Sequence, residues 1–126
     1  MTEATLKSAL VKELRTSCPF AVVLRHEDKI TSGIPDMSFT DGGSTSWWEA
    51  KLANPGFKSK GIQELMMLRL GRRGKAFYII WDIPRDFTFI VQPPDLSRYY
   101  EGVTQIQGMH PRDVAPKIWG CHDNHR

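Results

Sequence analysis

The sequence is short of several features that would place it in a specialised class of protein. Its two cysteines, Cys18 and Cys121, lie far apart and are too few for a disulfide framework, so we expect free thiols rather than a single bridge. No run approaches the ~20 apolar residues of a membrane span, and the N-terminus lacks the basic start and apolar block of a signal peptide. Internal repeats and low-complexity tracts are also missing. We therefore expect a cytoplasmic protein that makes no contact with a membrane.

The composition that remains is that of one ordinary globular domain. The chain has 126 residues, of which 40% are hydrophobic and 25% are charged. Residues 51–75 contain seven lysines and arginines but a single acidic residue, Glu64. With a formal net charge of +3, this uneven distribution is compatible with a polyanionic partner.

Hydrophobic periodicity predicts an α/β fold. A helix over residues 2–15 follows from its apolar face, with Thr2 as N-cap and Glu3 in the first turn. Further segments are predicted as strands over 20–24, 34–40, 46–52, 76–83 and 87–91, and as a helix from Ser59 to Arg69 or Leu70. We expect a single domain with a core over about 3–91 and an extension over about 92–126 that forms short helices and loops. This order predicts a mixed sheet flanked by helices.

The turn signal Asp41-Gly42-Gly43 predicts a β-hairpin over residues 34–52. Because strand side chains alternate between faces, the second strand has two distinct sides. One side carries Trp47, Glu49 and Lys51, and the other, which we assign to the core, carries Trp48, Ala50 and Leu52.

The same alternation predicts that two carboxylates converge in this hairpin. Met37 and Phe39 form the core side of the first strand, so Asp36 is expected to point to the opposite side. Its carboxylate would then lie beside that of Glu49 on the adjacent strand. Two close carboxylates repel each other unless a cation lies between them, and Mg²⁺ is typically held by one or two carboxylates with water and phosphate oxygens. Such an ion activates water, and Lys51 beside it can orient that water. The pattern therefore favours phosphodiester hydrolysis.

These residues carry a resemblance to a known family. Ile34-Pro35-Asp36, followed thirteen residues later by Glu49-Ala50-Lys51, resembles the PD-(D/E)xK nuclease superfamily, whose core is an αβββαβ unit. More narrowly, residues 33–36 (GIPD), residues 48–51 (WEAK) and Gln63 resemble the virus-type replication-repair nuclease group, and archaeal Holliday-junction resolvases are similar in the same core. The resemblance covers about residues 3–83. It implies a restriction-endonuclease-like fold and an endodeoxyribonuclease that depends on Mg²⁺ or Mn²⁺.

The resemblance also implies roles for single residues. Asp36 and Glu49 would be metal ligands, the Ala50 carbonyl a third ligand, and Lys51 the catalytic lysine. Gln63 would lie near that lysine or the phosphate. Many relatives add a glutamate from the first helix. Glu3 and Glu13 both qualify by position, and Glu3 is preferred because it shares a helix side with Leu6 and Leu10.

The expected partner is DNA. The residues expected to contact its phosphates are Lys58, Lys60, Arg72 and Arg73. So small a domain has little room for loops that read a long base sequence, which favours a branched, flapped or nicked duplex. Cutting a junction requires two coordinated sites and hence a homodimer. The resemblance to small virus-type nucleases favours a phage origin, in which case the protein would act in the host cytoplasm.

Plainer interpretations remain open for the same residues. Glu49 and Lys51 can form an ion pair on an exposed strand, Gln63 can be a surface residue, and the basic residues can be a solvated face. Trp47 can stack on a base or pack in the core.

The set Cys121, His122 and His125 is too small for a structural zinc site. The alternative function is a non-catalytic nucleic-acid-binding or assembly protein on the same fold.

Overall fold

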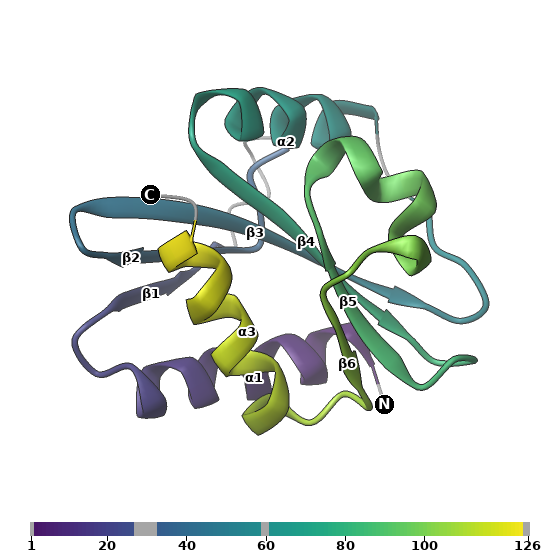
Figure 1. The fold of residues 1–126 in the computed structure, drawn as a ribbon, viewed down its shortest axis with the longest axis horizontal. Coiled ribbons are helices and arrows are strands. Elements are labelled where there is room, and N and C mark those ends of the chain that lie inside the picture. The colour runs from purple at the N-terminus through teal and green to yellow at the C-terminus, as the bar shows by residue number, and fades with distance from the viewer. Residues whose placement is uncertain (1, 27–32, 59–60, 125–126) are drawn as a thin grey trace.

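The computed structural model describes residues 2–26, 33–58 and 61–124. Its elements follow one another as shown in Figure 1. They are α1 (Glu3–Ser17), β1 (Val22–Arg25), β2 (Met37–Asp41), β3 (Ser44–Ala53), α2 (Gly61–Arg73), β4 (Lys75–Asp82), β5 (Phe87–Val91), the 3₁₀ segment η1 (Pro93–Glu101), β6 (Gln105–Gln107) and α3 (Pro111–Asn124). The fold is α/β, as the sequence predicts, and its first six elements have the order αβββαβ.

The described strands form one mixed sheet with the order β1-β2-β3-β4-β5-β6. Only β3 and β4 run parallel, because α2 connects them and returns the chain to the same end of the sheet. All other neighbours are antiparallel. Every residue of β4 is buried, as expected for a central strand that is covered on both faces.

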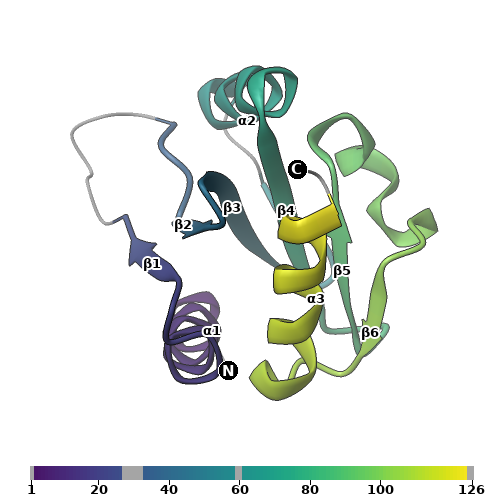
Figure 2. The same cartoon turned by 60° about the vertical axis from the view of Figure 1, so that its left-hand side comes forward.

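Helices cover both faces of this sheet, which makes three layers (Figure 2). Helices α1 and α3 lie side by side on one face, where they bury Leu10, Leu14 and Ile118 against Trp48. Helix α2 and η1 cover the other face, where Met67 is buried in a second, smaller cluster. Both clusters share the central strands β3 and β4, so the sheet is held rigidly where these strands run side by side.

The β2–β3 hairpin forms as predicted. Gly42 and Gly43 make its two-residue turn with φ angles of +62° and +77°, both in the left-handed region that a type I′ turn requires. Met37 and Phe39 are buried in the core beneath α1 and α3, together with Trp48. The predicted assignment of faces is therefore confirmed.

Several boundaries differ from the sequence-based prediction, among them the following three. The strand predicted over 34–40 begins only at Met37, so Asp36 lies just before it, and the strand predicted from Phe20 begins at Val22. Helix α2 continues through Gly71 to Arg73 instead of ending at Leu70, and Gly71 packs against Pro93.

The segment predicted as short helices and loops is more ordered than expected. Strand β6 extends the sheet beside β5, and α3 is a helix of 14 residues. Val114, Ala115 and Ile118 recur on one face of α3 and are buried against the same cluster as α1. This burial stabilises the helix even though Pro116 lies inside it.

Candidate active site

The candidate site lies where β3 continues beyond its partner β2. The last paired residues are Met37 and Trp48, whereas β3 runs on to Ala53 beside β4. In the described part of the chain, residues 49–53 therefore have a neighbouring strand on one side only. Backbone N–H groups on the other side need different acceptors.

Two carboxylates from outside the sheet supply these acceptors. Asp36 Oδ2 accepts a hydrogen bond from the Ala50 N–H at 2.9 Å, and Glu3 Oε1 accepts one from the Leu52 N–H at 2.9 Å. Within a strand the N–H and C=O of one residue point to the same edge, so the Ala50 carbonyl faces this edge too. Carboxylate and carbonyl oxygens are thus gathered along the free edge of β3.

Asp36 and Glu49 are brought together from adjacent segments. The Asp36 N–H donates a 3.0 Å hydrogen bond to Glu49 Oε1. Glu49 Oε2 forms an ion pair with Lys51 Nζ at 3.0 Å, and Lys51 Nζ also donates a hydrogen bond to Gln63 Oε1 at 3.0 Å. The side chains of Glu49 and Lys51 are only 3% and 11% exposed. The interpretation of an ion pair on an exposed strand is therefore wrong, because both partners are buried.

The surroundings of Glu49 make its ionised form unfavourable. Burial and, next, the negative charge of Asp36 raise the pKa of this carboxyl from 4.5 to about 7, against the opposing effects of Lys51 and Lys7. The single positive charge of Lys51 therefore does not neutralise the negative charges of both Asp36 and Glu49. A site of this kind gains from an additional cation.

Lys7 provides such a cation and is a residue that the sequence analysis missed. Its Nζ lies 3.0 Å from Asp36 Oδ2 and 3.3 Å from Glu3 Oε2. Burial lowers the pKa of Lys7, but the charges and hydrogen bonds of Asp36 and Glu3 outweigh burial and leave that pKa raised. The signal in the sequence was the spacing of four residues between Glu3 and Lys7, which places both on one side of α1.

The donor set suits a hard divalent cation but does not form a complete cage. Among the residues that the structure describes, no group of three or more His, Cys, Asp or Glu side chains could hold a metal ion. Mg²⁺ requires less than this, since one or two carboxylates with waters and phosphate oxygens suffice. Asp36 and Glu49, with the Ala50 carbonyl at the same edge, would fit that requirement.

The other residues predicted to act lie farther away. Glu13 follows Glu3 by ten residues along α1, which separates the two by about 15 Å. Arg72 and Arg73 are exposed at the C-terminal end of α2, roughly 14 Å along the helix from Gln63. Lys58 is exposed in the loop after β3, and Lys60 lies outside the described residues.

Two further sequence-based interpretations concern aromatic and histidine side chains. Trp47 is half-buried and its ring lies 5.6 Å from that of His26, so it packs beside the site without being fully covered. His122 is buried, and its ring contacts Ser46 Oγ at 2.7 Å and the Asp41 carbonyl at 3.0 Å. These contacts tie α3 to the hairpin; His125 lies outside the described residues.

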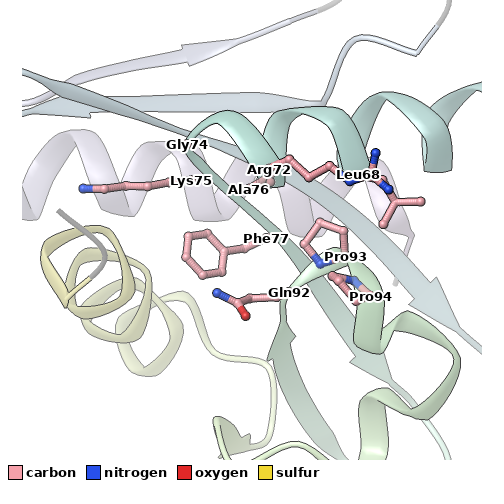
Figure 3. A pocket seen from close by; sticks show the side chains of 10 residues that line it. Leu68, Arg72, Gly74, Lys75, Ala76, Phe77, Gln92, Pro93 and Pro94 are labelled. Atoms are coloured by element: carbon pink, nitrogen blue, oxygen red, sulfur yellow. The ribbon is translucent and has the colours of Figure 1, made fainter.

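Two of the pockets beside α2 also involve neighbouring elements, and neither contains the carboxylates of the site. The pocket in Figure 3, of about 320 Å³, lies where the C-terminal end of α2 and the start of β4 meet Gln92 and Pro93. The other, of about 370 Å³, is lined by residues of α2 and η1 and by Tyr78. Tyr78 pairs in register with Glu49, and its buried hydroxyl has no hydrogen-bond partner among the described residues.

Comparisons with known protein families and curated proteins do not assign this chain to a family. No protein-family model and no curated protein matches this chain. In the described residues, none of the helices has the length and apolar character needed to cross a membrane. Any functional conclusion must therefore rest on the geometry at the free edge of β3.

Proposed function

We propose that this protein is a metal-dependent endodeoxyribonuclease of the PD-(D/E)xK type. The observation that carries the proposal is the convergence of Asp36, Glu49 and Lys51 at the point where β2 leaves β3. The order αβββαβ and the placement of Gln63 on the helix after the motif strand support the restriction-endonuclease-like interpretation.

The chain's own residues divide the work in this proposal. Asp36 and Glu49, which meet at the strand edge, would hold the ion there together with the Ala50 carbonyl. Bound Mg²⁺ or Mn²⁺ would supply positive charge at the phosphate and lower the pKa of a water molecule. Lys51 is fixed by Glu49 and Gln63, so its ammonium is held ready to orient the attacking water or a phosphate oxygen.

DNA is the proposed substrate because the exposed basic residues favour a phosphate backbone. Lys58, Arg72 and Arg73 are all exposed, and the chain carries a net charge of +3. A domain of this size favours recognition of a junction, flap or nick over a long base sequence. For a four-way junction, two copies must act on the two strands, so the active form there is a homodimer.

The test is an incubation of the purified protein with labelled four-way junction, flap, nicked, single-stranded and plain duplex DNA. Each substrate is combined with Mg²⁺, Mn²⁺ or EDTA. The proposal predicts cutting with either metal and none with EDTA, and the preferred substrate identifies the structure that is recognised. Cutting that is equally fast with EDTA would refute metal dependence.

One observation favours a second candidate function, that of a nucleic-acid-binding protein without catalysis. Lys7 already places a positive charge on Asp36, which reduces the need for a metal ion at that carboxylate. Under this alternative, the protein binds the DNA panel with EDTA present and cuts none of it with either metal.

A further inference from the structure

Lys7 stands out because it connects two of the carboxylates at the site. Its ammonium contacts Asp36 Oδ2 at 3.0 Å and Glu3 Oε2 at 3.3 Å, while Lys51 contacts Glu49. The Lys7 side chain is only 14% exposed, so these contacts are formed largely away from bulk water. Lys7 is therefore the cation that neutralises the Asp36 side of the site.

The Lys7 ammonium contacts the carboxylate oxygen that a metal ion would also bind. Asp36 Oδ2 is engaged by both the Ala50 N–H and Lys7 Nζ, so a divalent ion that binds this oxygen must compete with the ammonium. An ammonium carries one positive charge and a divalent ion carries two, which favours the ion beside several carboxylates. Lysine is also suited to leave, because its charge sits on a flexible four-carbon chain.

We infer that Lys7 is a resident cation that substitutes for the metal ion at Asp36 and is displaced when a divalent ion binds. This inference rests on the proposed function and specifies how the same site is regulated. In the metal-free protein, Lys7 limits repulsion between the carboxylates and keeps α1 docked on the edge of β3. The cost is a weaker apparent affinity for the metal, because the ion must break the Lys7–Asp36 contact.

The experiment measures Mn²⁺ binding by calorimetry and by the loss of the free-ion electron paramagnetic resonance signal, without DNA. Wild type is compared with Lys7→Met, which removes the charge and keeps much of the chain length. Lys12→Met is the matched control, since Lys12 is exposed on the same helix. Lys7→Arg retains the charge, and Asp36→Asn, alone and combined with Lys7→Met, identifies binding at this site.

We expect Lys7→Met to lower the Kd for Mn²⁺ by about tenfold or more, a difference of about 1.4 kcal/mol. Lys12→Met and Lys7→Arg should not tighten binding, and Asp36→Asn should abolish the tight site in either background. Thermal unfolding provides an independent measurement. Without metal, Lys7→Met should unfold at a lower temperature than wild type, and Mn²⁺ should raise its unfolding temperature by more than it raises that of wild type.

The outcomes separate this inference from the proposed function. If wild type binds Mn²⁺ and Lys7→Met binds it equally or more weakly, the inference is wrong and the proposed function stands. If Lys7→Met binds Mn²⁺ but wild type does not, Lys7 is a permanent substitute for the metal, which overturns both displacement and metal dependence. If neither binds, the inference is wrong, and the cleavage assay with Mn²⁺ and DNA decides the proposed function separately.

Discussion

At the scale of single residues, the site is defined by carboxylates whose negative charges are not fully neutralised by the neighbouring lysines. Glu49 is buried beside Asp36, and the Lys51 ammonium that pairs with it does not restore an ordinary pKa. A carboxyl group with a pKa of about 7 is a mixture of the protonated and the ionised form near neutral pH. Perturbed groups of this kind are concentrated at functional sites, where stability is lower than packing alone would give.

This arrangement predicts a pH-dependent gain in stability for Glu49→Gln. In EDTA, Glu49 loses its proton near pH 4.5 in the unfolded chain but near pH 7 in the folded chain. Between these values the folded state binds more protons, so the free energy of unfolding of wild type falls as the pH rises. Glutamine removes this dependence. The variant should therefore gain on the order of 2 kcal/mol over wild type between about pH 4 and about pH 8.

Urea unfolding of both proteins in EDTA, across that pH range, measures this gain. Glu13→Gln is the matched control, because it makes the same chemical change in α1 away from the site. A stability difference between Glu49→Gln and wild type that stays constant with pH would show that Glu49 is not held in an unfavourable ionised state.

At the scale of elements, the site depends on how the segment before β2 meets α2. Gly33 has a φ of +89° and is packed so closely that an added Cβ would lie 3.1 Å from Ile62 Cγ2 and 3.2 Å from the Ile62 carbonyl. Asp36 follows three residues later, and Gln63 follows Ile62 directly. This contact therefore fixes the distance between the Asp36 and Gln63 sides of the site.

We predict that Gly33→Ala destabilises the protein by about 2–4 kcal/mol, from the left-handed backbone together with the steric overlap. Gly43→Ala is the matched control, because Gly43 has a similar φ of +77° but no atom within 4 Å of an added Cβ. It should cost only about 1–2 kcal/mol. Chemical denaturation measures both. Equal losses in the two variants would mean that the close packing of Gly33 contributes nothing.

The local elements were predictable because their signals lie close together in the sequence. Thr2 caps α1 as expected, with its side chain accepting from the Thr5 N–H, and the Gly42–Gly43 turn sets the register of the hairpin. The contacts of α3 were not predictable in this way. Pro116 argues locally against a helix, and the buried contacts of His122 join residues more than 75 positions apart.

The candidate site shows the same division. The proximity of Asp36 and Glu49 was predicted from strand alternation and a short turn. In the structure Asp36 lies just before β2, and it meets Glu49 because the hairpin register places Met37 opposite Trp48. The contact of Glu3 with the Leu52 N–H joins α1 to β3 across 49 positions and was not predicted; the resemblance pointed to Glu3 only as a metal ligand. Lys7 was missed because the pairing with Asp36 requires the packing of α1 on the sheet edge.

At the scale of the whole molecule, the basic end of α2 is separate from the carboxylate site. Arg72 and Arg73 are exposed roughly 14 Å along α2 from Gln63, which is the length of about four base pairs at 3.4 Å each. A DNA duplex that reaches both must therefore lie along α2. Under the proposed function, the two arginines would therefore bind DNA and take no part in the cleavage step.

Replacement of both arginines by alanine should weaken DNA binding with a reduced dependence on salt. At about 0.9 per phosphate contact, the slope of log K against log salt concentration should fall in magnitude by about 1.8. The double variant Arg112→Ala, Lys117→Ala is the control, because it removes two exposed charges from α3 on the other face of the sheet. Fluorescence anisotropy across a salt series measures the slopes. Equal slopes for the two double variants would exclude Arg72 and Arg73 from the DNA contact.

The central claim is that the free edge of β3 is a site of phosphodiester hydrolysis, and Asp36→Asn tests it most directly. The measurement is the single-turnover cleavage rate with Mg²⁺ on the DNA that wild type cuts best, alongside DNA binding in EDTA. Asp113→Asn, an exposed change in α3, is the control. We predict that Asp36→Asn slows cleavage by about a thousandfold, or about 4 kcal/mol of transition-state stabilisation, while DNA binding persists. Cleavage by Asp36→Asn at the wild-type rate would contradict the account.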